Sequence, residues 1–196
     1  MKKFRKILSV VLTLVMVLAM AAPGFAGTGT NEQDNGTIEI SDTNLGETYK
    51  IYKIFDLESF SFPDVDEEGN PIESESGNYS YYITSNSAWY GFVSTGGAGA
   101  SYISLTPAGE IGGASKYYVT WKEAAGTAEQ FAKLALQYAE TETNNVSDNG
   151  SRKSQVDGEI LTFSNLDLGY YLVDSSTGAL CSLDTTNLVA EIDEKN

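Results

Sequence analysis

The chain has 196 residues, of which 27 are acidic, 12 are basic, one is Cys and none is His, and its formal net charge is −15. The lack of His excludes Ser-His-Asp and Cys-His nucleophiles and His-ligated metals, and a single Cys excludes an internal disulfide and a multi-thiolate metal site. The acidic balance disfavours nucleic acid as a partner, because phosphate contacts need Lys and Arg, while 41% hydrophobic residues are enough for a folded core.

Residues 1–26 are predicted to be a secretion signal. The segment starts with Lys2, Lys3, Arg5 and Lys6, continues as an apolar run, and ends in small residues that suit signal peptidase. The alternative, an N-terminal membrane anchor, is disfavoured because the apolar run is short. We therefore expect an exported chain, secreted or held at the cell surface, that begins near residue 27.

The exported chain is predicted to consist mainly of short strands. Residues 27–36 are polar and Gly-rich and are expected to form a disordered lead-in. A short helical turn is expected over 86–93. Runs of β-branched and aromatic residues predict strands at 37–40, 49–57, 79–83, 102–105, 116–121, 160–163, 170–174, 179–183 and 188–192.

One amphipathic helix is predicted between these strands. It begins with a capping box formed by Thr127 and Gln130. Its apolar residues Phe131, Leu134, Ala135 and Tyr138 recur at helical spacing. Many short strands with one inserted helix indicate a mainly β fold, a β-sandwich over residues 37–192, with 193–196 as a linker to a following domain.

Lys53 is a candidate for internal chemistry. In a regular strand Ile51, Lys53 and Phe55 share one face, so Lys53 points into the sandwich if that face is the buried one. A buried Lys tends to lose its proton and can become a nucleophile. If the other face is buried, Lys53 is solvated.

Asp174 and Asn187 complete one chemical hypothesis. Asp174 shares a face with two large neighbours, and a desolvated carboxylic acid stays protonated and can polarise an amide. Asn187, just before the last predicted strand, supplies a carboxamide. An unprotonated Lys53 could attack that carboxamide and release ammonia, leaving an isopeptide bond. The alternatives are a surface Asp and an ordinary turn Asn.

A weaker calcium pattern lies in the acidic loop over 63–78. Asp64, Asp66, Glu68 and Glu75 occupy positions 1, 3, 5 and 12 of a calcium-binding loop. The predicted flanks are strands rather than helices, so a solvated acidic loop is the main interpretation and no metal or cofactor is expected.

Cys181, between apolar neighbours, is expected to be a small buried side chain. An intermolecular disulfide is the alternative. Trp89, Tyr90 and Trp121 could line a sugar-binding face, although core packing is the more common use of such residues.

Three strings together resemble the N-terminal domain of Gram-positive sortase-assembled pilins, the isopeptide-forming fimbrial subunits. They are YKIYKIFDLE, YYVTW before the helix, and LGYYLVDSSTGALCSLDTTN near the end. The resemblance covers most of residues 37–196. It implies an immunoglobulin-like sandwich with insertions, no enzymatic activity, and assembly with other pilin subunits by a sortase.

The resemblance also implies roles for particular residues. The sortase acceptor Lys lies near the end of this domain in the family, which corresponds to Lys195 in IDEKN. Family isopeptide bonds join a Lys on the first strand to an Asn on the last. The first predicted strand here has no Lys, so Lys53 would act from the second strand, with Asp174 at the position of the family's acid.

The sequence therefore predicts a structural, adhesive subunit of a cell-surface pilus or wall-anchored fimbrial protein. The alternative is a secreted module that binds a carbohydrate or a host protein. A secreted hydrolase with paired carboxylates is a third and weaker hypothesis, because the acidic residues cluster in predicted loops.

Overall fold

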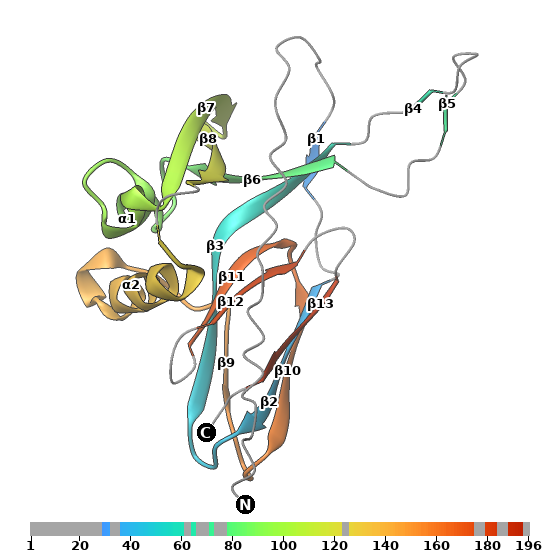
Figure 1. Cartoon of the computed structure of the whole chain (residues 1–196), viewed down its shortest axis with the longest axis vertical. Helices are drawn as coiled ribbons and strands as arrows, with labels where there is room; N and C mark the ends of the chain where they lie inside the picture. The colour runs from blue at the N-terminus through green and yellow to red at the C-terminus, as the bar shows by residue number, and fades with distance from the viewer. Residues whose placement is uncertain are drawn as a thin grey trace, which may run out of the picture.

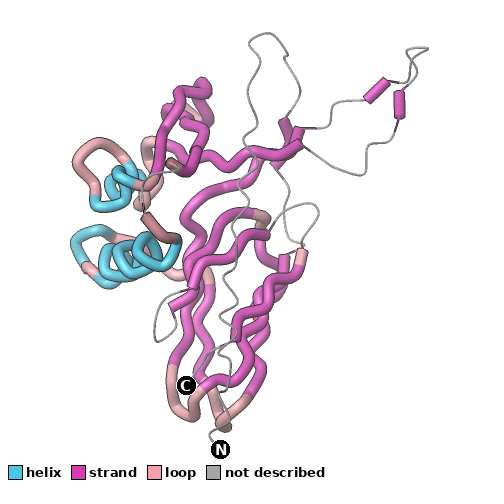
Figure 2. Tube along the Cα trace, viewed as in Figure 1, coloured by secondary structure: helices cyan, strands magenta, loops and turns pink. Residues whose placement is uncertain are grey.

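The computed structural model describes residues 29–31, 36–60, 64–65, 71–72, 78–122, 126–174, 179–183 and 188–193. Within these residues the fold is mainly β, with two packed sheets in a sandwich-like arrangement (Figures 1 and 2). This confirms the predicted fold class. No helix of the described part is both long and apolar enough to cross a membrane.

The larger sheet is built around β3 (Thr48–Phe60). Its strand order is β12 (Ala179–Leu183), β11 (Gly169–Asp174), β3, β6 (Asn78–Thr84), β8 (Ala114–Trp121) and β7 (Ile103–Ile111). Two short strands, β1 (Gly29–Asn31) and β9 (Gly150–Lys153), also pair with β3. β3 bends across the molecule: its first half runs along the sandwich, and its second half leads to the region where it pairs with β6 and β1 (Figure 1).

The smaller sheet has the order β10 (Glu159–Leu166), β2 (Gly36–Thr43) and β13 (Val189–Asp193). β2 pairs antiparallel with β10 and parallel with β13. Its inward side chains are apolar and buried, because alternate residues of each strand face the larger sheet. They include Ile38, Ile40, Leu161, Phe163 and Ala190. A separate two-stranded unit joins β4 (Asp64–Val65) and β5 (Pro71–Ile72).

The helices pack against the other face of the larger sheet (Figure 2). They are α1 (Tyr90–Val93), α2 (Ala128–Glu140) and two 3₁₀ turns, η1 (Ala98–Ser101) and η2 (Glu142–Asn144). Phe92 of α1 and Phe131 of α2 pack on each other, with ring centroids 5.2 Å apart. Tyr52 of β3 contacts Trp89, just before α1, with centroids 6.3 Å apart. Such ring contacts add to the burial energy of a second core.

The predicted helix is confirmed in position and in its cap. Gln130 N donates to Thr127 Oγ1, and Thr127 N donates to Gln130 Oε1, each at 3.2 Å. Phe131 and Ala135 are fully buried, as the helical spacing predicts.

Two stretches differ from the sequence-based prediction. Residues 29–31 of the predicted disordered lead-in form β1, paired with β3. Residues 150–153, which are polar and are not among the predicted strands, form β9. Both strands are short and follow the edge of β3, so backbone pairing rather than an apolar pattern holds them.

Candidate functional site

A β-bulge in β3 decides which side chains meet. Tyr171 pairs with Lys53 while the preceding residue, Tyr170, pairs with Phe55, so Ile54 is an extra residue on β3. A bulge shifts the alternation of faces. Lys53 therefore lies on the inner face of the larger sheet with Ile51, whereas Phe55 turns to the helical face and stacks on Tyr170. The expectation that Lys53 and Phe55 share a face is wrong for this reason.

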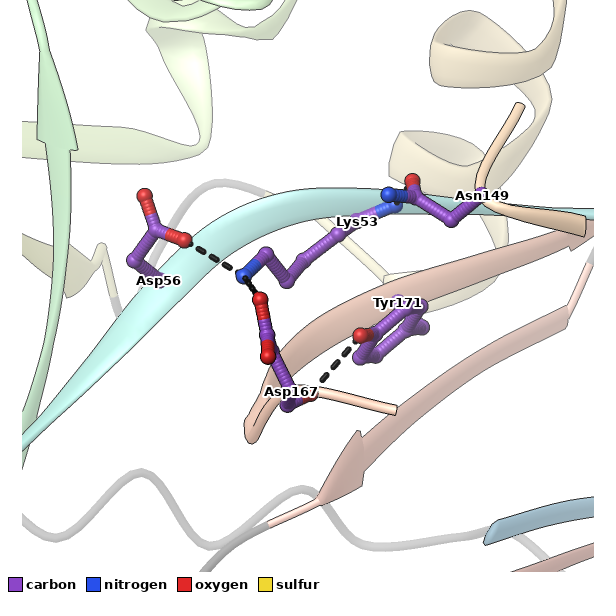
Figure 3. Close-up of polar contacts among 5 residues, drawn as sticks. All are labelled: Lys53, Asp56, Asn149, Asp167 and Tyr171. Atoms are coloured by element: carbon purple, nitrogen blue, oxygen red, sulfur yellow. Dashed lines mark hydrogen bonds and ion pairs between the residues drawn. The ribbon is translucent and has the colours of Figure 1, made fainter. Parts of the chain in front are cut away.

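The same bulge places Asp56 on the face of Lys53. Lys53 Nζ lies 2.7 Å from Asp56 Oδ1 and 3.2 Å from Asp167 Oδ2, in the turn between β10 and β11 (Figure 3). The Lys53 side chain is 17% exposed, and the two carboxylates are 41% and 43% exposed. Lys53 is thus half-enclosed at the rim of the sandwich, bound by two solvated anions.

The backbone around Lys53 is fixed by further polar contacts. Lys53 N donates to Asn149 Oδ1 at 2.6 Å, and Tyr171 Oη donates to the carbonyl of Asp167 at 2.7 Å (Figure 3). Burial, reinforced by nearby Asp167, raises the pKa of Tyr171 well above its usual range. The phenol therefore stays protonated and can keep donating to this turn.

Gly169 gives the Lys53 side chain its room. A Cβ at residue 169 would lie 2.5 Å from the carbonyl oxygen of Phe55 and 2.9 Å from Lys53 Cδ. The Gly of the LGYYLV string therefore has a steric role, because β11 approaches β3 too closely for a side chain at that point.

A second ion pair lies further along β3. Glu58 binds Lys116 Nζ from β8, and Tyr118 Oη donates to the same carboxylate oxygen, Oε2, at 3.0 Å. Lys116 Nζ also lies 4.6 Å from the ring centroid of Tyr82 and 4.9 Å from that of Tyr118. The Lys116 side chain is only 6% exposed, so this cation is held by one carboxylate and two aromatic faces.

The five residues Lys53, Asp56, Glu58, Lys116 and Asp167 form what we call the charged stripe. Each amine in it lies against a carboxylate. Among the described residues, no group of three metal-ligating side chains could hold a metal ion. The stripe ties the turn after β10 to β3, and β3 to β8 across β6.

The structure separates two of the residues in the isopeptide hypothesis. Asp174 pairs with Lys50 while Lys53 pairs with Tyr171, three residues back along β11. Alternation puts Asp174 on the helical face, opposite Lys53. Asn187, the third member of the hypothesis, lies outside the described residues, as does the predicted acceptor Lys195.

Two other sequence-based expectations also involve residues that the structure does not describe. Asp64 lies in β4, but Asp66, Glu68 and Glu75 of the calcium pattern are outside the described residues. The signal at 1–26 is outside them too.

The expectations for Cys181 and the tryptophans are met by core packing. Cys181 is buried on β12, where burial raises its thiol pKa to about 12. Trp89 is 4% exposed, and the ring centroid of Trp121 lies 5.2 Å from that of Phe131. Trp89 is therefore a core residue, and Trp121 is partly buried against the same cluster.

Sequence reasoning missed most of the charged stripe. Lys116 stands at the start of KYYVTW, where its alternation with Tyr118 and Thr120 could have indicated an inward cation. Asp56 and Glu58 follow the apolar part of β3. The face on which they lie depends on the bulge at Ile54, and no sequence pattern predicts that bulge.

The fold and the stripe together define a mainly β, sandwich-like protein with a structural ion-pair network. A scan against protein-family models matched none, and searches of curated proteins and of solved structures found no match.

Proposed function

We propose that this chain is the N-terminal structural domain of a cell-surface pilus or wall-anchored fimbrial subunit that supports adhesion. The proposal combines the resemblance of three strings to sortase-assembled pilins with the arrangement of the two ends of the fold. It assigns the domain a mechanical and spacing role rather than catalysis.

The path of the chain through the smaller sheet carries the proposal. β2 is its first strand, β13 is its last, and the two run parallel, with Thr37 opposite Val189 and Ser41 opposite Asp193. The chain therefore enters at one end of this pair and leaves at the other (Figure 1). Such a domain can be joined in series with others without folding the chain back, which a filament subunit requires.

The strings behind the resemblance coincide with the buried framework. YKIYKIFDLE is most of β3, YYVTW belongs to β8, and LGYYLVD runs along β11, the direct neighbour of β3. Tyr170 and Leu172 of that last string are fully buried. This supports a shared fold as the basis of the resemblance, because these positions pack in the core rather than decorate the surface.

Export and assembly follow from the same proposal. The predicted signal at 1–26 would deliver the chain outside the cell, and its partners would be a sortase and other pilin subunits. Lys195 is the proposed acceptor, since it follows β13 directly in the sequence, where a link to the next subunit would continue the line of the chain.

The test is an immunoblot of cell-wall digests from cells that produce the protein, with antiserum against the domain. Covalent polymerisation predicts a ladder that survives boiling in detergent. Lys195→Ala should collapse the ladder to the monomer, whereas Lys153→Ala, at an exposed Lys of β9, should leave it intact. A single monomeric band from unaltered cells would contradict the proposal.

A further inference from the structure

We propose that β2 and β13, here called the terminal strand pair, form a mechanical clamp that resists tension applied between the residues before Gly36 and those after Asp193. This inference goes beyond the proposed function, because it concerns the fold alone and applies wherever tension reaches the start of β2 and the end of β13.

The direction of the two strands sets how the load is shared. Thr37 N donates to Leu188 O at 2.8 Å, and the parallel register continues for five residue pairs to Ser41 and Asp193. Pulling the start of β2 away from the end of β13 draws the strands along their own length. The hydrogen bonds of the ladder are then loaded together rather than one at a time.

Side-chain packing opposes the same movement. Ile38 and Ile40 of β2 are fully buried opposite Ala190 and Ile192. A slip of one residue would turn the apolar side chains outward, so faces match again only after two residues, roughly 6.6 Å at the usual rise per residue of a parallel strand. The apolar core must open before the pair can slide to a new register.

β2 is also held from its other side. It pairs with β10 from Gly36 to Thr43, and the corner beyond it is fixed by Thr43 Oγ1, which donates to Glu159 O at 2.8 Å. The central strand of the smaller sheet thus cannot leave with β13 still attached unless it also breaks from β10. The load passes into the whole sandwich.

The side on which each N–H lies provides a matched pair of substitutions. Because Leu188 O accepts from Thr37, alternation turns the N–H groups of Ala190 and Ile192 toward β2 and that of Glu191 away from it. Ile192→Pro removes a ladder donor, while Glu191→Pro removes an N–H on the open side of β13, where proline is tolerated.

The decisive experiment is single-molecule force spectroscopy on the mature chain with two attachment geometries. Asn35→Cys with Asp193→Cys loads the pair in shear. Asn35→Cys with Leu188→Cys pulls at the same end of the ladder and opens it bond by bond. The native Cys181 is buried and should not take a handle. We expect severalfold higher unfolding forces in the shear geometry.

Equal forces in both geometries, or a lower force in shear, would overturn the clamp. In the shear geometry, Ile192→Pro should lower the force, and Glu191→Pro should leave it near that of the parent. If Ile192→Pro does not fold by circular dichroism, the comparison of attachment points still decides, because it uses the native strands. The result does not depend on whether cells polymerise the chain.

Discussion

At the scale of single residues, the ion pair between Lys116 and Glu58 is the one whose disruption should cost the most stability. Lys116 is 5% exposed overall, and its ammonium has one carboxylate and two rings around it. Removing one partner of a buried ion pair leaves an uncompensated charge, whereas replacing both with apolar groups can be nearly neutral.

We therefore expect Lys116→Met to lower the free energy of unfolding by about 3–5 kcal/mol. The double substitution Lys116→Met with Glu58→Leu should recover most of that loss. Urea unfolding of the parent, both single variants and the double variant completes the cycle. A Lys116→Met variant within about 0.5 kcal/mol of the parent would mean that solvent already screens the pair.

Lys53 leads to a prediction about covalent chemistry. Its amine is held by Asp56 and Asp167, and Asp174 faces the other side of the sheet. Asp174 therefore cannot act as the acid for an attack by Lys53. We expect residues 27–196, the chain without the predicted signal, to keep their full calculated mass in intact mass spectrometry.

The other outcomes of that measurement are informative. A deficit of one ammonia, absent in Lys53→Ala, would restore the isopeptide hypothesis with Asn187. A deficit of one water would mean that Lys53 had condensed with one of its two carboxylates. Lys133→Ala is the matched control, because Lys133 forms an exposed ion pair with Glu129 on α2.

Lys53 also shows where inference from the sequence stops. Strict alternation correctly placed it with Ile51, but it failed two residues later, at Phe55, because one bulge at Ile54 exchanges the faces of β3. Bulges have weak local signals, since any residue can be the extra one. Every residue of the stripe that lies beyond the bulge was missed.

At the scale of elements, α2 was the most predictable part of the fold. Its apolar spacing and its cap are both local, so a short window of sequence contains all the information. β9 was missed because its pairing partner, Thr48–Ile51, is about a hundred positions away and its own residues are polar. A polar strand that pairs with a distant segment shows no alternation of apolar residues by which the sequence could reveal it.

The capping box yields a quantitative prediction. Thr127→Ala removes the acceptor for Gln130 N and should cost about 1 kcal/mol of stability. Thr127→Ser keeps the oxygen and should cost much less. Urea midpoints at constant slope would measure both. An unchanged midpoint in Thr127→Ala would indicate that the first turn of α2 contributes little to the cooperative unit.

At the scale of the whole molecule, the two cores differ in chemistry. The space between the sheets is filled mainly by aliphatic side chains, whereas the helical side is filled by stacked and edge-on rings. Several of the phenols are buried, and a phenol out of water resists ionisation. The stability of the fold should therefore depend on pH in the alkaline range.

That dependence has a definite sign. Burial raises the pKa of Tyr52 and of Tyr118 from 10.0 to about 12, and that of Cys181 from 9.0 to about 12. Below about pH 8 these groups are protonated in both states, so their contribution is fully present. As the pH rises toward 12 the unfolded chain ionises first, so each such group lowers the stability of the fold over this range.

We expect urea midpoints that begin to fall near pH 9, where the unfolded thiol ionises, and fall more steeply above pH 10, with absorbance of the buried tyrosinates appearing together with the loss of circular dichroism. Tyr52→Phe should make the fall less steep, because one group no longer titrates between the two pKa values. Full tyrosinate absorbance near pH 10 in a chain that is still folded would contradict the argument. It would mean that water reaches the phenols, and that the helical side is a loosely packed cover rather than a second core.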